Sequence, residues 1–288
     1  MKSVIILSCV SLMAVFISGC KSVSDEEALK SYVINRDFRG ARNVMKRMIA
    51  SGADVNTTRT IEGIAPLHVA VVTDDIEFAK FLILKGADVN IKADNGFTPL
   101  NFAAASGYDY STKMIKLLLK NGANPNSCNN LQSPLIGASR NGYYEIVKLL
   151  VENGADVNLA DGGKATALLC ANDVKITKYL IDKGANVKAK NIDGRTVLMH
   201  VVCCREMNTT EKNELISLLI EKGVEINVVQ QSFIELKYGL HPTPYTALDW
   251  AITNEQPEEI ISLLRSKGAK TAAELKAEKP APASDDKK

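Results

Sequence analysis

A five-residue motif, Gly-Ala-Asp-Val-Asn or a close variant, recurs along this chain and constrains its fold more than any other feature. Its copies begin at Gly52, Gly86, Gly122, Gly154, Gly184, Gly223 and Gly268, so that neighbouring copies stand 30 to 45 residues apart. A second motif, Thr-Pro-Leu or a variant of it, begins at residues 65, 98, 133, 166, 196 and 246. Motifs that alternate at this spacing indicate one structural unit copied and stacked along the chain.

The residue types in each motif predict the structure of that unit. Thr98 can cap the N-terminus of a helix, and Pro99 suits the first helical position, where no backbone N–H is needed. Apolar residues then recur at helical spacing as far as Gly122, which suits the left-handed position that ends a helix. Asp94-Asn95-Gly96 is typical of a turn. Each unit is therefore predicted to be two antiparallel helices followed by a projecting turn.

Together the two motifs resemble the Thr-Pro-Leu-His-x-Ala and Gly-Ala-Asp-Val-Asn segments of the ankyrin repeat family. The resemblance implies an all-α repeat fold, an ankyrin solenoid of about seven helix pairs with projecting β-turn or hairpin fingers. In the later units Pro gives way to Ala or Val, and the motif keeps its His only at His68. In the family this His hydrogen-bonds neighbouring turns, which implies a structural role for His68.

The resemblance divides the chain into a repeat domain and its flanks. The repeat domain is expected over residues 25–269, the first unit being an N-terminal cap and residues 270–288 a disordered tail of Lys, Asp and Pro. Unit five has only 18 residues between its two motifs (166 to 184), against 21 in the regular units. The expected units are 25–56, 57–90, 91–126, 127–158, 159–188, 189–227 and 228–269.

The N-terminus is typical of an exported protein. Lys2 precedes an apolar run over residues 4–17, too short to span a bilayer, as in a secretory signal. Ile17-Ser18-Gly19-Cys20 resembles a bacterial lipobox, which implies cleavage of a 1–19 signal peptide, acylation of Cys20 (palmitate) and a lipidated tether over 20–24. The resemblance implies a lipid-anchored protein of the bacterial cell envelope, facing the periplasm, with the outer membrane favoured over the inner, or at the cell surface. An ordinary cleaved signal with an incidental Cys is the alternative.

Catalytic and metal-binding patterns are missing from the sequence. No Cys-x-x-Cys occurs, and we expect no catalytic residues, no metal and no cofactor. A formal net charge of +2 argues against nucleic acid as a partner. The adjacent Cys203 and Cys204 are interpreted as helix-packing residues, although a disulfide from either of them to Cys170 stays open, as does the pairing of Cys128.

The family implies binding of a protein partner, by a monomer. The contact positions that carry over from the family are the residues before the second motif and the ends of first helices. An insertion over 228–245, too apolar for a mere linker, either packs back on the solenoid or adds aromatic contact residues. Three of the first group, large and apolar, are expected to face water and to anchor a partner. The expected contact residues are Ile64, Phe97, Gln132, Arg195 and Tyr245, then Val72, Arg140 and Asn141, then Phe233 and Tyr238.

Three functions remain open on the sequence alone. The first is a membrane-anchored scaffold that binds a protein in the bacterial envelope. The second is an exported effector or immunity-type inhibitor that acts on a protein of another cell. The third is an enzyme whose site is completed by the 228–245 insertion, where Glu235 and His241 are the titratable residues on offer.

Overall fold

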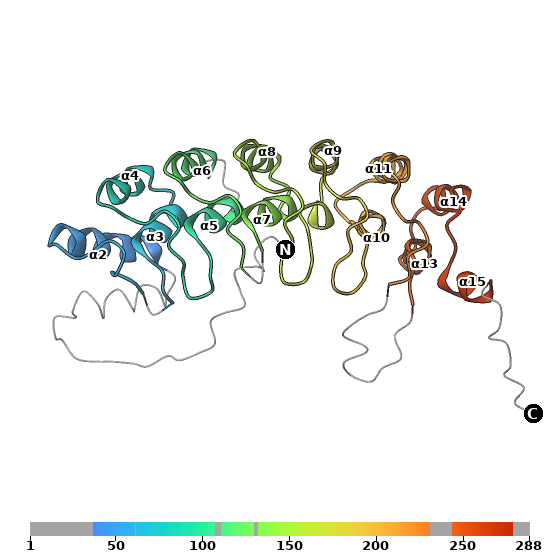
Figure 1. Cartoon of the computed structure of the whole chain (residues 1–288), viewed down its shortest axis with the longest axis horizontal. Coiled ribbons are helices and arrows are strands. Elements are labelled where there is room, and N and C mark those ends of the chain that lie inside the picture. The colour runs from blue at the N-terminus through green and yellow to red at the C-terminus, as the bar shows by residue number, and fades with distance from the viewer. Residues whose placement is uncertain (1–36, 61, 107–110, 130–131, 231–243, 279–288) are drawn as a thin grey trace, which may run out of the picture.

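Two rows of helices form a gently curved array in the computed structural model of this chain (Figure 1). The structure describes residues 37–60, 62–106, 111–129, 132–230 and 244–278. In this part of the chain the secondary structure is helical apart from two isolated β-bridges, so the all-α solenoid predicted from the repeats is confirmed. Fingers project from the side on which the array is concave (Figure 1).

Each of units two to seven contributes one helical element to each row. The array starts with α2 (Phe38–Ala50) and ends with α15 (Ala272–Ala277). The inner row, next to the fingers, consists of α3 (Pro66–Val72), α5 (Pro99–Ser106), α7 (Pro134–Arg140), the 3-10 turn η1 (Leu168–Cys170), α10 (Val197–Cys203) and α13 (Ala247–Thr253). The outer row consists of α4 (Ile76–Leu84), α6 (Ser111–Lys120), α8 (Tyr144–Glu152), α9 (Val174–Asp182), α11 (Thr209–Glu221) and α14 (Glu258–Ser266).

The helices begin and end as the motifs predict. The side chains of Ser133, Thr196 and Thr246 accept hydrogen bonds from backbone N–H groups in the first turns of α7, α10 and α13. Gly86 follows α4 with a φ of 86°, a conformation that costs a side-chain-bearing residue energy. Local sequence therefore determines where each helix starts and stops.

One hydrophobic core runs through the whole array. The leucine of the second motif is at most 1% exposed in each unit, as shown by Leu67, Leu100, Leu135, Leu168 and Leu248. The two helices of a unit pack on each other and on the helices of the neighbouring units, as expected of a repeat protein.

An asparagine ladder joins neighbouring units on the surface. The Asn90 side chain donates to the carbonyl of Gly122 (2.9 Å) and accepts from the N–H of Asn124 (2.7 Å). The same pair of bonds recurs at Asn56, Asn126, Asn158 and Asn227. Lys188 stands at the equivalent position of unit five, so the ladder is interrupted between units five and six.

Two expectations need correction. Unit five lacks a full first helix: the three missing residues reduce it to η1, a single turn between α7 and α10. The 270–288 segment is not wholly disordered, because Ala272–Ala277 forms α15. Thr271 caps this helix and Glu274 completes the capping box, a local signal that outweighs the polar composition of the segment.

Other predictions fall on residues that the structure does not describe, or are settled only in part. The 1–19 signal, Cys20 and the 20–24 tether lie outside the described residues, as do Phe233 and Tyr238. No helix in the described part of the chain is long and apolar enough to cross a membrane. All four described cysteines are free thiols, so the disulfide considered for Cys170 is not formed in this structure.

Candidate functional site

The fingers and the inner helices carry the residues predicted to contact a partner, but two of those residues are buried. Ile64 is 7% exposed, because backbone bonding between Thr60 and Ile64 closes the finger and turns this side chain into the core. Gln132 is 6% exposed and accepts a hydrogen bond from Arg140 (3.1 Å). The expectation that Ile64 faces water is therefore wrong, and Gln132 supports a neighbouring side chain.

The predicted aromatic residues also pack within the array. Phe97 is half-buried with its ring edge-on to Phe102, 5.6 Å between centroids. Its carbonyl accepts a hydrogen bond from Nε2 of the buried His68 (3.1 Å), which joins the two units. Tyr245 is half-buried against Trp250, with 5.1 Å between ring centroids. Both aromatic residues are only partly exposed, so neither is a freely exposed anchor.

The predicted residues at the ends of first helices differ in exposure. Val72 ends α3 and is half-buried. Asn141 is exposed, and its side-chain amide donates to the carbonyl of Gly137 (2.9 Å) at the end of α7. Arg140, the last residue of α7, is half-buried and borders a cleft.

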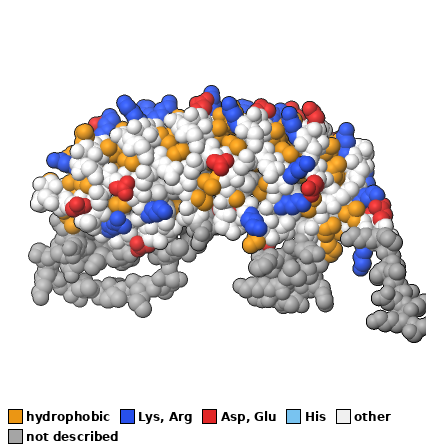
Figure 2. All heavy atoms as spheres, in the orientation of Figure 1, with side chains coloured by type: hydrophobic (Ala, Val, Ile, Leu, Met, Phe, Trp, Pro, Cys, Tyr) orange, Lys and Arg blue, Asp and Glu red, His pale blue; other side chains and the backbone are white. Residues whose placement is uncertain are grey.

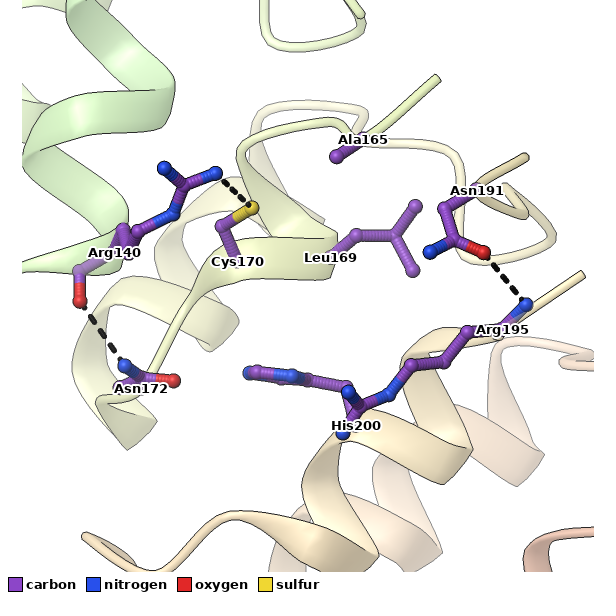
Figure 3. Close-up of a pocket in the computed structure, with 8 residues that line it drawn as sticks. All are labelled: Arg140, Ala165, Leu169, Cys170, Asn172, Asn191, Arg195 and His200. Carbon is purple, nitrogen blue, oxygen red and sulfur yellow. Dashed lines mark hydrogen bonds between the residues drawn. The ribbon is translucent and has the colours of Figure 1, made fainter. Parts of the chain in front are cut away.

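This cleft, of about 250 Å³, lies where the first helix of unit five is shortened to η1 (Figure 3). Arg140 and Arg195 enter it from opposite sides, the first from α7 and the second from the finger that precedes α10 (Figure 3). The remaining wall residues are Ala165, Leu169, Cys170, Asn172, Asn191 and His200. The structure therefore brings together two of the predicted contact residues, Arg140 and Arg195, that lie 55 positions apart in the sequence (195 − 140).

His200 is the titratable wall residue with a strongly shifted pKa. Burial, together with the charge of Arg195, lowers its pKa to about 4. Its Nε2–H donates to the carbonyl of Ala171 (3.0 Å), which fixes the ring. The imidazole is thus neutral at physiological pH, and the positive charge of the cleft comes from the two arginines.

Two exposed apolar residues on the fingers of units six and seven are not among the contact residues predicted from the sequence. Ile192 is 52% exposed in the finger that carries Arg195, and Val229 is 39% exposed in the next finger. Hydrophobic side chains reach the lower edge of the described array in its C-terminal half (Figure 2). Ile192 could have been predicted as exposed, because it is an aliphatic residue within the polar turn Asn191-Ile192-Asp193-Gly194. Within a finger, the contact positions implied by the family include only the residue just before each second motif.

Among the described residues, no group of three or more His, Cys, Asp or Glu side chains is arranged so that it could hold a metal ion. Glu235 and His241, considered for an enzymatic site, lie outside them. The flanks of that insertion are held together, because Gln230 and Tyr245 exchange backbone hydrogen bonds of 2.8 and 3.2 Å.

Comparison with known proteins identifies a family over most of the chain. The family described as "Ankyrin repeats (3 copies)" matches residues 32–127, 74–161 and 164–274. A crystal structure of an ankyrin repeat domain from Acinetobacter baumannii AYE superposes with a TM-score of 0.58 at 27% identity, over 71% of this chain and 98% of that one.

Curated relatives match at similar identity but are much longer proteins. Protein FPV018 of Fowlpox virus is 33% identical over 224 residues, 76% of this chain and 30% of its own length. The B-cell lymphoma 3 protein homolog of Mus musculus is 34% identical over 137 residues, 47% of this chain and 30% of its length. Alpha-latrocrustotoxin-Lt1a of Latrodectus tredecimguttatus is 35% identical over 144 residues, 44% of this chain and 10% of its length. This chain therefore spans less than a third of each of these relatives.

Proposed function

This chain belongs to the ankyrin repeat family, and from that membership we propose that it is a non-catalytic scaffold that binds a protein partner. Ankyrin repeat proteins are in general binding scaffolds, so the family supports binding over catalysis. We place the contact on the finger side of units five to seven, and we expect one copy of the chain to bind as a monomer.

The observation that carries this proposal is the exposure of apolar side chains on neighbouring fingers. Ile192 and Val229 expose 52% and 39% of their surface, although an aliphatic residue in a polar turn gains nothing from contact with water. Arg195 lies three positions after Ile192 in the same finger, and Tyr245 exchanges backbone bonds with the finger of Val229 through Gln230. Apolar residues beside Arg and Tyr have the composition of an interface centre.

Capture of partners from an extract of the native host, with matched variants, tests the binding surface. Ile192→Asp should lose partner capture, because a carboxylate would be buried against the partner at the centre of the contact. Leu84→Asp is the control, since Leu84 is 87% exposed on the outer helix α4, away from the fingers. Equal capture by both variants would place the contact elsewhere, and equal loss would show that any added charge interferes.

We further propose that the scaffold is tethered to the bacterial envelope by a lipid on Cys20. The support is the sequence Ile17-Ser18-Gly19-Cys20 behind an apolar run. A single acyl chain anchors a protein only reversibly, so several chains on one Cys suit a lasting tether. Lys21 follows the Cys and favours the outer membrane over the inner, facing the periplasm or the cell surface.

Metabolic labelling tests the tether independently of the partner. Labelled palmitate should be incorporated into the wild-type protein and not into Cys20→Ser. Cys128→Ser, which alters a described thiol within the repeats, serves as the control and should label like the wild type. Labelling of Cys20→Ser at the wild-type level would leave an ordinary secretory signal as the better interpretation.

A further inference from the structure

The cleft beside η1 contains two guanidinium groups that lack a carboxylate partner. Arg140 donates to the neutral amide of Gln132 (3.1 Å) and to the sulfur of Cys170 (3.5 Å). Nε of Arg195 is shielded from solvent and has no hydrogen-bond partner, although this side chain interacts with the thiol of Cys203. Neither arginine forms an ion pair within the described residues.

The nearby carboxylates accept hydrogen bonds from groups other than the two arginines, that of Asp193 from the side-chain amide of Asn191 (3.4 Å). Asp161 accepts the backbone N–H groups of Gly163 and Ala165, both at 2.9 Å, and so closes its own finger. Glu206 acts on His200 through its charge but contacts the thiol of Cys204 (3.4 Å). No carboxylate of the described residues therefore lies within ion-pairing distance of either guanidinium group.

The other wall residues limit which kind of anion can bind to the two arginines of the cleft. The amide of Asn172 is fixed on the carbonyl of Arg140 (3.0 Å), and Leu169 and Ala165 add an apolar wall. A volume of about 250 Å³ is below the range of roughly 300–1,000 Å³ usual for pockets that hold drug-sized ligands and cofactors. The cleft thus suits a short apolar stem that ends in a compact anion.

We propose that this cleft binds a glutamate or aspartate side chain of the protein partner, an inference that rests on the proposed function. A carboxylate has the planar shape that guanidinium groups recognise with paired hydrogen bonds. The cleft lies in the same finger region as Ile192, so an acidic side chain can enter it while apolar neighbours cover the exposed finger residues. Arg140 and Arg195 then determine which partner sequence is accepted.

Titration of the full-length protein with a small probe tests the cleft without the partner. The probe is N-acetylglutamate N-methylamide, its neutral counterpart is the glutamine analogue, and the readout is the ¹H–¹⁵N signal of the arginine Nε–H groups. We expect the acidic probe to shift the Arg195 signal saturably and the glutamine analogue to leave it unmoved. Equal shifts from both probes, or no saturable shift from the acidic one, would overturn the assignment.

Variants and a competing anion sharpen the test. Arg140→Gln should lower the affinity for the acidic probe about ten- to a hundredfold, the usual range for a charge-assisted contact. Lys116→Gln on the outer helix α6 is the control and should leave that affinity unchanged. Arg195→Lys keeps the charge but loses the planar guanidinium group, so it should lower the affinity for the acidic probe. Circular dichroism checks that this variant is folded. Inorganic phosphate that saturates the cleft at a lower concentration than the acidic probe would overturn the side-chain assignment.

Partner capture separates this inference from the function on which it rests. If Arg140→Gln and Arg195→Lys both capture the partner as well as the wild type, the acidic side-chain inference fails and the binding scaffold stands. If the acidic probe binds as described while the wild-type protein captures no partner, the proposed function fails and the cleft remains an anion site.

Discussion

Two histidines make the stability of this array sensitive to mildly acidic pH. Burial lowers the pKa of His68, and of His200, from 6.5 to about 4. Between these values the unfolded chain binds protons that the folded chain excludes, so the stability that is present above pH 6.5 is lost as the pH falls toward 4. By this linkage each histidine removes about 2 kcal/mol from the free energy of unfolding at pH 5.

Urea unfolding at pH 7.5 and pH 5.0 measures this loss. His68→Gln should be less stable than the wild type at pH 7.5, because the ring joins Ala65 to Phe97 through bonds of 3.1 Å each. Its further loss on acidification should nonetheless be smaller than that of the wild type, since one proton-binding site of the unfolded chain is gone. Identical losses in the two proteins would show that His68 is protonated in the folded state.

The same scale shows where sequence reasoning about the site succeeded and where it failed. His68 was correctly interpreted as structural, because its motif determines its bonds locally. Ile64 was misplaced, since whether a finger residue faces water depends on how the finger closes. The cleft was not predicted, because Arg140 and Arg195 meet only through the packing of two separate units against η1.

Among the elements, the seam between units five and six is the one at which the asparagine ladder is interrupted, because Lys188 stands at the ladder position. Asn158 bonds both Gly184 and Asn186 across the preceding seam, at 3.1 and 2.8 Å. Lys188 cannot accept the second of these bonds, and Lys190 instead forms an exposed ion pair with Glu225 (2.7 Å). Exposed ion pairs contribute little, whereas each hydrogen bond of a ladder contributes about 0.5–1.5 kcal/mol.

Lys188→Asn should therefore restore the ladder and stabilise the protein by about 1 kcal/mol. Asn158→Lys is the matched reverse change and should destabilise it by a similar amount. Chemical denaturation of both variants measures the free energies, and amide hydrogen exchange at Glu225 should slow in Lys188→Asn. If neither variant moves the unfolding midpoint, the ladder follows from the stacking of units and does not stabilise it.

Repeat counting anticipated the irregular elements but not their form. The spacing of 18 residues in unit five predicts a shortened helical part. It does not predict which helix is shorter: the first is reduced to η1, whereas the second, α9, keeps nine residues. The prediction from composition that residues 270–288 are disordered was wrong at α15, because a capping box and a hydrogen bond to Asp249 of α13 order this polar segment.

At the scale of the whole molecule, the solenoid could be predicted from the sequence, because the units repeat the same capping and turn motifs and each contacts only its neighbours. Among the described residues, no further pair of helices packs on the last inner helix, α13. Segment 270–278 takes that place: Lys270 bonds Asn227 and Thr246, both at 2.8 Å, and the N–H of Ala272 donates to Asp249 (2.8 Å). We infer that α15 closes the C-terminal end of the array.

Two deletions test this end cap. Removal of residues 270–288 should lower the free energy of unfolding by about 1–3 kcal/mol, because Asn227, Thr246 and Asp249 each lose one hydrogen bond to the deleted segment. Removal of 279–288 alone keeps those bonds and should leave the midpoint unchanged. Since coupling passes only between neighbours, hydrogen exchange should quicken in α13 and α14 in the longer deletion and stay as in the wild type in α3. Uniformly faster exchange along the array would mean that the units unfold as one body, and that α15 supports the whole molecule and not only its last unit.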